Sequence, residues 1–341
     1  MDTTRTCLGT DNADLGLSSR VRSWLRHRSA RATDWTAAEL AAVKGERTVT
    51  VIIPARDEEQ TVGQIVRTIR TALMEETSLV DDVLVVNSRS RDDTARVAAE
   101  AGARVVAQDT VLRPLPGMHG KGEALWKGLA ATTGDFVVFV DGDLYDFTEW
   151  YVIGLLGPLL TDSGVDYVKG FYHRPLVNGS RIDADGGGRV TELVARPLLN
   201  MYWPDLAGFV QPLAGEYAGR REVLESIPFV THYGVEVAHL IDLLRWRGLE
   251  SLAQVDLGMR THRHQNTHAL GQMAGQIMLT VMDRLDRSGR LVAKEPPSTL
   301  LAQFCRSESN EGVGRELVVN DLAVRERPPL RTIRRTPGPS G

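Results

Sequence analysis

Two carboxylates, Asp141 and Asp143, directly follow a short apolar run rich in valine and phenylalanine, with Gly142 between them. The run predicts a strand buried on both faces of a sheet. Residues i and i+2 of a strand point to the same side, so both carboxylates could meet one cation. Ligands bind at the carboxyl ends of strands in open α/β sheets, and Mg²⁺ and Mn²⁺ prefer oxygen ligands. The pattern predicts a metal–nucleotide site, although Asp-x-Asp alone also occurs in surface turns.

A lysine between two glycines, Gly120-Lys121-Gly122, is a second candidate. The glycines would let the backbone approach a ligand, and the lysine supplies a point charge suited to phosphate. It is not a Walker A loop, because the upstream glycine and the following Ser/Thr are wrong. A solvent-facing turn is the alternative. Residues 54–59, which follow an expected strand, offer a place for a nucleoside, or form only a strand end and a capped helix.

Three consecutive glycines, Gly186 to Gly188, run into Arg189 and Thr191. Successive backbone N–H groups at a helix start, with a guanidinium and a hydroxyl, suit a phosphate or a carboxylate. This segment therefore predicts a second anion site, with a plain flexible connection as the alternative.

Two further residues could take part in the chemistry. His262 stands in a loop after an expected strand, and its neutral imidazole is a candidate third metal ligand beside Asp143. A surface histidine is the ordinary alternative. Glu236 lies near the start of an expected helix, where it could orient a hydroxyl or simply complement the helix dipole.

The elements that must position these residues alternate between strand and helix in the first half. Strands are expected at 49–53, 83–87, 104–107 and 135–141, and helices from 57, at 92–100 and at 123–131. Such alternation favours a parallel sheet with right-handed crossovers. The second half is less regular. Its expected elements are strands at 165–169 and 252–258 and helices at 237–244 and 270–285, the first of these helices ending before Gly248.

Composition excludes several classes of protein. The 341 residues are 42% hydrophobic and 25% charged, with a formal charge of −4, so nucleic acid is not expected as the main partner. Cys7 and Cys305 alone cannot form a disulfide framework or a cysteine zinc site. No run approaches the ~18 apolar residues of a membrane helix, and the N-terminus lacks the apolar core of a signal peptide. We therefore expect a cytoplasmic protein without a membrane segment.

Seven segments of the chain together resemble the sequence pattern of a known enzyme family. In chain order they are Ile53–Glu59, Gly120–Trp126, Val140–Asp143, Gly186–Pro197, Gln211–Tyr217, Tyr233–Glu236 and Thr261–Arg263. Together they resemble the retaining glucosyl-3-phosphoglycerate synthases, GT-A-fold glycosyltransferases related to the mannosyl-3-phosphoglycerate synthases. The resemblance implies an α/β protein whose Rossmann-like, mostly parallel sheet is joined to a C-terminal acceptor-binding region.

The resemblance also implies a UDP-glucose donor and Mg²⁺ or Mn²⁺. Asp143 and His262 would hold the metal, and Asp141 would lie close to the donor's ribose or sugar. Lys121 would stabilise charge on the departing diphosphate, with Glu236 near the reacting hydroxyl. Residues implied around the nucleotide and donor sugar are Pro54, Ala55, Glu58, Ser88, Gly142, Gly215, Glu216 and Tyr217. Those implied around the acceptor are Gly188, Arg189, Thr191 and His264.

Four positions depart from the family's pattern. Asn87 stands where Asp is usual, Arg89 where Gly is usual, Ala214 where Ser is usual and His264 where Asn is usual. The first two lie near the expected nucleotide, and the others near the sugar and the acceptor phosphate. They leave open the donor base and the acceptor.

The leading hypothesis is metal-dependent, retaining transfer of glucose from UDP-glucose to 3-phosphoglycerate. Transfer to another small phosphorylated or nucleoside-like acceptor, a sugar-phosphate nucleotidylyltransferase and a non-catalytic nucleotide-sugar-binding protein are the alternatives. The expected organisation is a disordered segment 1–20, a nucleotide-sugar half 21–145, an acceptor-binding and metal-completing half 146–285, and an extension 286–341. The resemblance implies a homodimer, with this extension as a possible contact.

Overall fold

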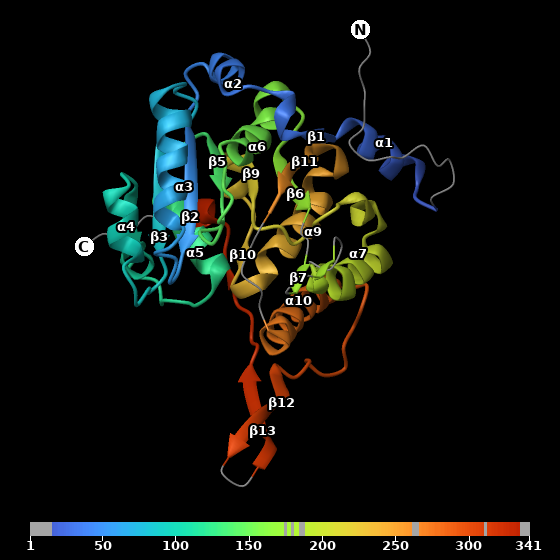
Figure 1. The fold of residues 1–341 in the computed structure, drawn as a ribbon. Coiled ribbons are helices and arrows are strands. Elements are labelled where there is room, and N and C mark those ends of the chain that lie inside the picture. The colour runs from blue at the N-terminus through green and yellow to red at the C-terminus, as the bar shows by residue number, and fades with distance from the viewer. Residues whose placement is uncertain are drawn as a thin grey trace, which may run out of the picture.

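One eight-stranded sheet runs through the protein (Figure 1). The computed structural model describes residues 16–173, 176–178, 181–183, 188–260, 266–309 and 312–334. In spatial order the strands are β1 (Ser29–Arg31), β11 (Leu252–Met259), β6 (Tyr167–His173), β9 (Tyr217–Arg220), β5 (Phe136–Phe139), β2 (Val49–Ala55), β3 (Asp82–Asn87) and β4 (Arg104–Ala107). Only β9 runs antiparallel to its neighbours, β5 and β6. The α/β class and the mostly parallel sheet are therefore confirmed.

Helices cover both faces of this sheet, because side chains alternate along each strand. Along β2, Val51 and Ile53 join one buried apolar cluster, and Ile52 joins the other. The first cluster is closed by α2 (Ala37–Lys44), α3 (Val62–Ile69), α4 (Thr94–Glu100) and α6 (Trp150–Thr161). The second is closed by α1 (Ser19–His27), α5 (Lys121–Ala130), α7 (Arg196–Tyr202), α8 (Arg221–Leu224), α9 (Val235–Arg247) and α10 (Thr267–Arg287).

Several element ends follow their local chemistry. Thr36 caps α2, and its side chain accepts from the N–H of Glu39 while the Glu39 carboxylate accepts from the N–H of Thr36. The helix α9 ends before Gly248, whose φ of +83° is unfavourable for a residue with a Cβ. The first helix begins at Ser19, inside the segment expected to be disordered.

Two expectations near the candidate site were wrong. The helix α3 begins at Val62 rather than at Asp57, because Asp57 has a left-handed φ of 59° that cannot continue a helix. The strand β5 ends at Phe139, so Asp141 and Asp143 lie in the loop beyond it. Strand alternation is therefore not what brings these two carboxylates together.

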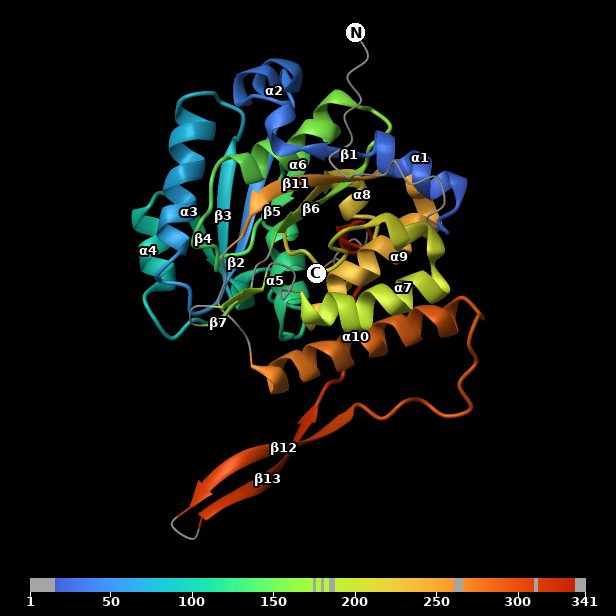
Figure 2. The same ribbon diagram turned by 45° about the vertical axis from the view of Figure 1, so that its right-hand side comes forward.

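The C-terminal segment, for which the sequence predicted no strand, contains a hairpin and a further strand. After α10, a hairpin of β12 (Leu300–Ser309) and β13 (Gly312–Asp321) projects from the body, as Figures 1 and 2 show. The chain then returns as β14 (Glu326–Arg327), which pairs with β10 (Phe229–Val230), and ends its described part in α11 (Leu330–Arg334). A short hairpin also joins β7 (Leu176–Asn178) and β8 (Arg181–Asp183).

The C-terminal segment contains a buried charged residue. Arg327 is 3% exposed, and its Nε and Nη2 donate to the fully buried carboxylate of Glu123 at 2.6 and 2.7 Å. The tail is thereby fixed to α5, the helix that begins with Lys121. Within the described residues, no helix has the length and apolar character needed to span a membrane.

Candidate active site

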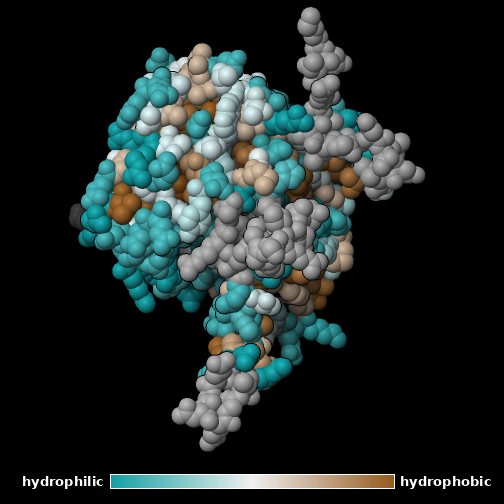
Figure 3. All heavy atoms as spheres, in the orientation of Figure 1, coloured by the Kyte–Doolittle hydropathy of each residue, from teal (hydrophilic) through white to brown (hydrophobic). Residues whose placement is uncertain are grey.

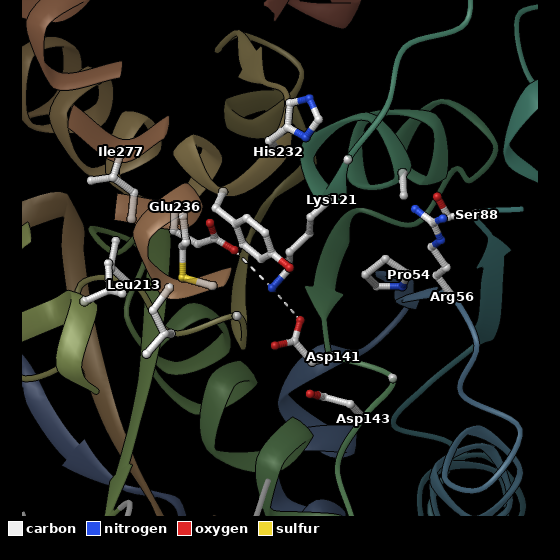
Figure 4. Close-up of a pocket in the computed structure, with 18 of the residues that line it drawn as sticks. Pro54, Arg56, Ser88, Lys121, Asp141, Asp143, Leu213, His232, Glu236 and Ile277 are labelled. Carbon is white, nitrogen blue, oxygen red and sulfur yellow. Dashed lines mark ion pairs between the residues drawn. The ribbon is translucent and has the colours of Figure 1, made fainter. Parts of the chain in front are cut away.

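A cavity of about 500 Å³ opens at the carboxyl ends of β2, β3 and β5 (Figure 4). Pro54 and Ala55 end β2, Ser88 follows β3, and Asp141 follows β5 by two residues. The opposite wall comes from α9 and α10. The proposed site residues that line the cavity are Pro54, Ala55, Glu58, Ser88, Lys121, Asp141, Gly142, Asp143, Gly188, Arg189, Thr191, Gly215 and Glu236. Residues far apart in the chain are thus gathered around one space.

Lys121 lies at the centre of the cavity floor, between two carboxylates (Figure 4). Its Nζ is 2.5 Å from Oδ1 of Asp141 and 3.0 Å from Oε1 of Glu236. Burial works to lower the pKa of Lys121, but Asp141 and then Glu236 outweigh it and raise that pKa well above its ordinary value. Lys121 is therefore a fixed cation that faces the cavity.

Asp141 is held ionised by the same contacts. Burial works to raise its pKa, and Lys121 followed by Arg260 overcomes this effect and lowers the pKa to about 2. Asp141 thus keeps its negative charge throughout the range in which enzymes ordinarily work.

Arg260, at the end of β11, joins the remaining acidic residues. Its Nη1 donates to both oxygens of Glu216 at 2.9 and 3.0 Å and to the hydroxyl of Tyr172. Its Nη2 lies 3.1 Å from Oδ1 of Asp143 and 3.4 Å from Oδ2 of Asp141. One guanidinium nitrogen is therefore shared by the two aspartates, which shows that both carboxylates converge on a position suited to positive charge.

That convergence supports a divalent cation at the aspartates. Asp143 is partly exposed to the cavity and supplies the hard oxygen that Mg²⁺ and Mn²⁺ prefer. Among the described residues, no group of three or more His, Cys, Asp or Glu side chains could hold a metal by itself. His262 and His264 lie outside the described residues. A cation at Asp143 would thus need His262, substrate oxygens or water to complete its ligands.

Two residues expected at the donor sugar do not reach the cavity surface. Glu216 and Tyr217 are each 0% exposed and do not line the cavity. Glu216 turns toward Arg260, and Tyr217 is a β9 residue whose ring packs 4.8 Å, between centroids, from that of Phe139. They lie beneath the site instead of in it.

The glycines of the site provide close packing. A Cβ on Gly122 would collide with the carbonyl oxygen of Val230, so this glycine lets α5 approach β10. It does not serve, as the sequence analysis expected, for approach to a ligand. A Cβ on Gly215 would collide with both Asp141 and Lys121. Gly215 therefore leaves the space in which that ion pair forms and which a ligand could reach.

The residues expected around the acceptor begin a helix on the far side of the cavity. Gly188 has a φ of +73°, and its carbonyl oxygen accepts from the N–H of Glu192 at 3.0 Å. Arg189 and Thr191 follow it and line the cavity, with Thr191 opening a π-helical turn, Thr191–Ala195, that leads into α7. A guanidinium and a hydroxyl thus stand at the N-terminal end of a helical segment, where an anion is favoured.

Sequence reasoning missed part of the cavity. It gave no role to Arg260, and it did not single out the other lining residues, which are Arg56, His119, Ala124, Tyr172, Val190, Leu213, His232, Tyr233, Leu270, Met273 and Ile277. The position of Arg260 directly after a strand, at the edge that holds Asp141, was a usable signal. The apolar residues of α10 carried none, because a helical apolar stripe ordinarily predicts core packing.

Comparison with known proteins identifies the family. Residues 50–185 match the model of glycosyl transferase family 2. The chain is 46% identical to a glucosyl-3-phosphoglycerate synthase of Mycolicibacterium smegmatis over 91% of this chain and 98% of that protein. The chain belongs to the glucosyl-3-phosphoglycerate synthase family.

Solved structures agree with this membership of the glucosyl-3-phosphoglycerate synthase family. Mannosyl-3-phosphoglycerate synthase from Rubrobacter xylanophilus has a TM-score of 0.83 at 39% identity, covering 93% of this chain and 99% of that one. Glucosyl-3-phosphoglycerate synthase from Mycobacterium tuberculosis, in complex with Mn²⁺, UDP-glucose and phosphoglyceric acid, has a TM-score of 0.74 at 40% identity, covering 88% and 95%. Another structure of the tuberculosis enzyme contains Mg²⁺ and UDP. The chain is therefore a GT-A-like glycosyltransferase.

Two departures from the glucosyl-3-phosphoglycerate synthase pattern form contacts of their own. Oδ1 of Asn87 accepts from the N–H of Ser90 at 3.1 Å. Arg89 adopts a left-handed φ of 62°, which glycine would adopt without strain. Its guanidinium bonds both oxygens of Asp109 at 2.7 and 2.8 Å and a ring nitrogen of His119 at 2.6 Å. Arg89 thus ties together two loops next to Ser88.

Proposed function

We propose that this protein transfers glucose from UDP-glucose to 3-phosphoglycerate, with Mg²⁺ or Mn²⁺ as its metal. The observation that carries the proposal is the placement of Lys121 between Asp141 and Glu236 in a cavity that Arg189 and Thr191 also line, in a chain of this family. The donor's nucleotide would lie along Pro54, Ala55 and Ser88. The acceptor's phosphate would lie at Arg189 and Thr191, with His264 as a further proposed contact.

Lys121 would bind the diphosphate from the cavity floor. An ammonium has three N–H donors, and two of them are directed to Asp141 and Glu236. The third can donate to a phosphate oxygen, and the fixed positive charge stabilises the negative charge that develops as the C1–O bond to the diphosphate breaks. Asp143 and His262 would hold the metal, which when bound neutralises further charge on the leaving diphosphate.

The remaining carboxylates would orient the reactants. Glu236, fixed by Lys121, would accept a hydrogen bond from a hydroxyl near the reacting carbon, and Asp141 would hold the ribose or sugar. As the new bond forms between C1 and the acceptor oxygen, the hydroxyl proton would pass to the departing diphosphate. Both carboxylates are engaged by cations, which favours their role as positioning groups over that of a nucleophile. Attack on the same face as the leaving group would retain the configuration at C1.

Release of UDP from UDP-glucose with Mn²⁺ tests the proposal, measured with and without 3-phosphoglycerate. The expected result is acceptor-dependent release that Asp143→Ala abolishes. Asp146→Ala is the matched control, because Asp146 is exposed and does not line the cavity. Release with other small acceptors only would replace 3-phosphoglycerate, and release of pyrophosphate from UTP and glucose 1-phosphate would favour a nucleotidylyltransferase. Metal-dependent binding of UDP-glucose without turnover would favour a binding protein.

Mannosyl transfer is a second candidate for the sugar. The structural similarity to the mannosyl-3-phosphoglycerate synthase of Rubrobacter xylanophilus, at a TM-score of 0.83, favours testing it. The same assay with GDP-mannose decides between them. Faster acceptor-dependent release from GDP-mannose than from UDP-glucose would overturn the choice of glucose.

The protruding hairpin supports a homodimer. On one face of β12 and β13, Phe304 pairs with Leu317 and Ala302 with Val319, and all four are exposed. Figure 3 shows hydrophobic surface on the hairpin near the body. A two-stranded hairpin alone is marginally stable, so this face needs a partner. A second copy supplies one, because the exposed residues Met278 and Met282 lie one turn apart on α10, and a two-fold dimer would pair both patches twice.

We also propose a cytoplasmic location, because the proposed donor and acceptor are phosphorylated molecules that do not cross a bilayer unaided. Fractionation of cells that express the protein would test this location. Recovery of the protein outside the cytoplasmic fraction would contradict it.

A further inference from the structure

Beneath the cavity, four polar side chains meet on one face of the sheet: Tyr167 and Lys169 of β6, Tyr217 of β9 and His239 of α9. Lys169 and Tyr217 are paired across the two strands, and Nζ of Lys169 lies 4.8 Å from the ring centroid of Tyr217. The ring of His239 stands edge-on to both tyrosine rings, at centroid distances of 6.2 and 5.7 Å. Each of the four residues is at most 1% exposed. They form one buried polar cluster, referred to below as the Lys169 cluster.

The polar atoms of the Lys169 cluster lack protein partners. Both tyrosine hydroxyls, both ring nitrogens of His239 and Nζ of Lys169 make no hydrogen bond to any described residue. A buried polar group without a partner costs about 1–3 kcal/mol, and a charged one costs more. A buried lysine with a structural role is bonded, as Lys44 is to Asp81 and to the carbonyl oxygen of Ser78. The contact with the ring of Tyr217 offsets only part of this cost, and an unfavourable buried group of this kind is expected at a functional site.

The charged groups around Lys169 belong to the candidate active site. The charged side chains whose electrostatic fields shift the pKa of Lys169 are Glu236 of α9, Lys121 of α5, Glu216 before β9 and Asp141 after β5. Burial lowers the pKa of Lys169 to about 7, the largest opposing effect being that of Glu236. The uncharged polar neighbours are Tyr167, Tyr217 and His239, and burial keeps His239 neutral by lowering its pKa well below the ordinary value. Near neutral pH, Lys169 can thus gain or lose a proton readily.

Charge balance gives this lysine a role. In the ion-pair network of the described residues, Lys121 and Arg260 are the only cations bonded to Asp141, Asp143, Glu216 and Glu236. Within the part of the chain that the structure describes, Lys121 is the only ion-pair partner of Glu236. A bound diphosphate would draw on the charge of Lys121 and add negative charge to the cavity. The ammonium of Lys169 is then a second positive charge that acts on Glu236.

We propose that Lys169 is a positioning residue of the transfer reaction, whose buried ammonium holds Glu236 in place when Lys121 engages the donor's diphosphate. The inference rests on the proposed function for the identity of the donor. Tyr167, Tyr217 and His239 supply the hydroxyls and ring nitrogens through which ordered water can join Lys169 to its surroundings. Lys169 acts through Glu236 and does not touch the substrate.

This role couples donor binding to protonation. The diphosphate favours the charged form of Lys169, so its pKa rises on binding and the protein takes up protons at a pH above 7. Calorimetric titration of UDP into the Mn²⁺-saturated protein at about pH 8, in buffers of different ionisation enthalpy, measures this uptake. Any contribution from the cavity histidines His119 and His232 remains in a Lys169 variant, so the difference between variant and wild type belongs to Lys169.

Lys169→Met is the decisive variant, because methionine keeps the apolar stem and removes the ammonium. We expect UDP-linked proton uptake to fall, kcat to drop about tenfold or more, as for the loss of one pKa unit of stabilisation, and KM for UDP-glucose to change less. The melting temperature should stay the same or rise, because an unbonded buried charge is removed. Lys44→Met, the matched buried lysine away from the cavity, should lower the melting temperature and leave uptake and kcat unchanged.

Two results would overturn the role. Equal proton uptake by wild type and Lys169→Met would do so whether or not the wild type turns over UDP-glucose. A melting temperature that falls in Lys169→Met while kcat stays at the wild-type value would identify a structural lysine. If Lys169→Met does not fold, Lys169→Gln is measured in the same way and decides the question. If the wild type releases no UDP in response to the acceptor, only the proposed function is refuted, because proton uptake is measured with UDP alone.

Discussion

Replacing Arg327 by methionine should destabilise the catalytic half of the molecule, although Arg327 lies near the C-terminus. The side chain of Glu123 is fully buried and receives both Nε and Nη2 of Arg327, at 2.6 and 2.7 Å. Methionine would leave that carboxylate buried without its cation. Removal of one partner from a buried ion pair costs about 3–5 kcal/mol. At an unfolding entropy of about 2.1 cal/mol/K per residue over 341 residues, the melting temperature should fall by about 4–7 °C.

Urea unfolding and thermal melting of Arg327→Met measure this loss. Arg325→Met is the control, because Arg325 is exposed and its removal should cost no more than about 0.5 kcal/mol. Combining Arg327→Met with Glu123→Leu should recover part of the stability, since no buried charge is then left unpaired. A loss below about 1 kcal/mol in Arg327→Met, or a double variant less stable than the single one, would refute the argument that this pair fixes the tail to α5.

Three further predictions concern the site, the hairpin and the response to acid. Gly215→Ala should lower kcat/KM by about 100-fold or more, because its Cβ would displace the ion pair between Lys121 and Asp141. Gly314→Ala, which has open space around it, should leave kcat/KM unchanged. Equal activities of the two variants would contradict the geometry. Phe304→Ser should convert the proposed dimer to a monomer in light scattering after gel filtration, and an unchanged mass would refute the hairpin contact. A hydrogen bond from Arg28 lowers the pKa of Asp162 in the folded protein. The stability that this ion pair contributes is therefore complete above the pKa of Asp162 in the unfolded chain, and it is lost as the pH falls through the lower pKa of the folded protein. The difference in unfolding free energy between wild type and Arg28→Met should therefore shrink below about pH 4, and a difference that grows there would contradict this sign.

The sequence allowed six of the eight strands of the sheet to be predicted, because these six are short, mainly apolar runs, whereas β1 and β9 were not expected. Residues 83–87 and 104–107 became β3 and β4, and Asp141 follows β5 at the expected edge. The helix that begins at Thr267 was expected from its apolar spacing. These features depend on neighbouring residues, so local patterns were sufficient.

Features that depend on distant contacts were not predictable in this way. Arg327 reads as part of a charged tail, and only the pairing of β14 with β10 places it against Glu123. Lys169 lies in a short strand whose sequence gives no sign that its amine is buried. The convergence of Asp141 and Asp143 depends on Arg260, which comes from a strand more than 100 residues away along the chain.

Two predictions about glycine and acid residues failed for physical reasons. Negative charge at Asp57 was taken as a helix start, but its left-handed backbone holds a turn before α3. The glycine at position 122 was taken as ligand-facing, but the carbonyl of Val230 occupies the place of its missing side chain. Sequence patterns indicate that a glycine is needed and do not indicate which neighbour requires it.

Transfer of glucose to 3-phosphoglycerate with retention at C1 can be read from the product itself, by proton NMR after reaction of UDP-glucose, 3-phosphoglycerate and Mn²⁺. We expect one new anomeric signal with the small coupling of an α-glucoside, formed together with UDP and absent with Asp143→Ala. A β-linked product would contradict retention, and UDP with free glucose as the only products would contradict transfer to 3-phosphoglycerate.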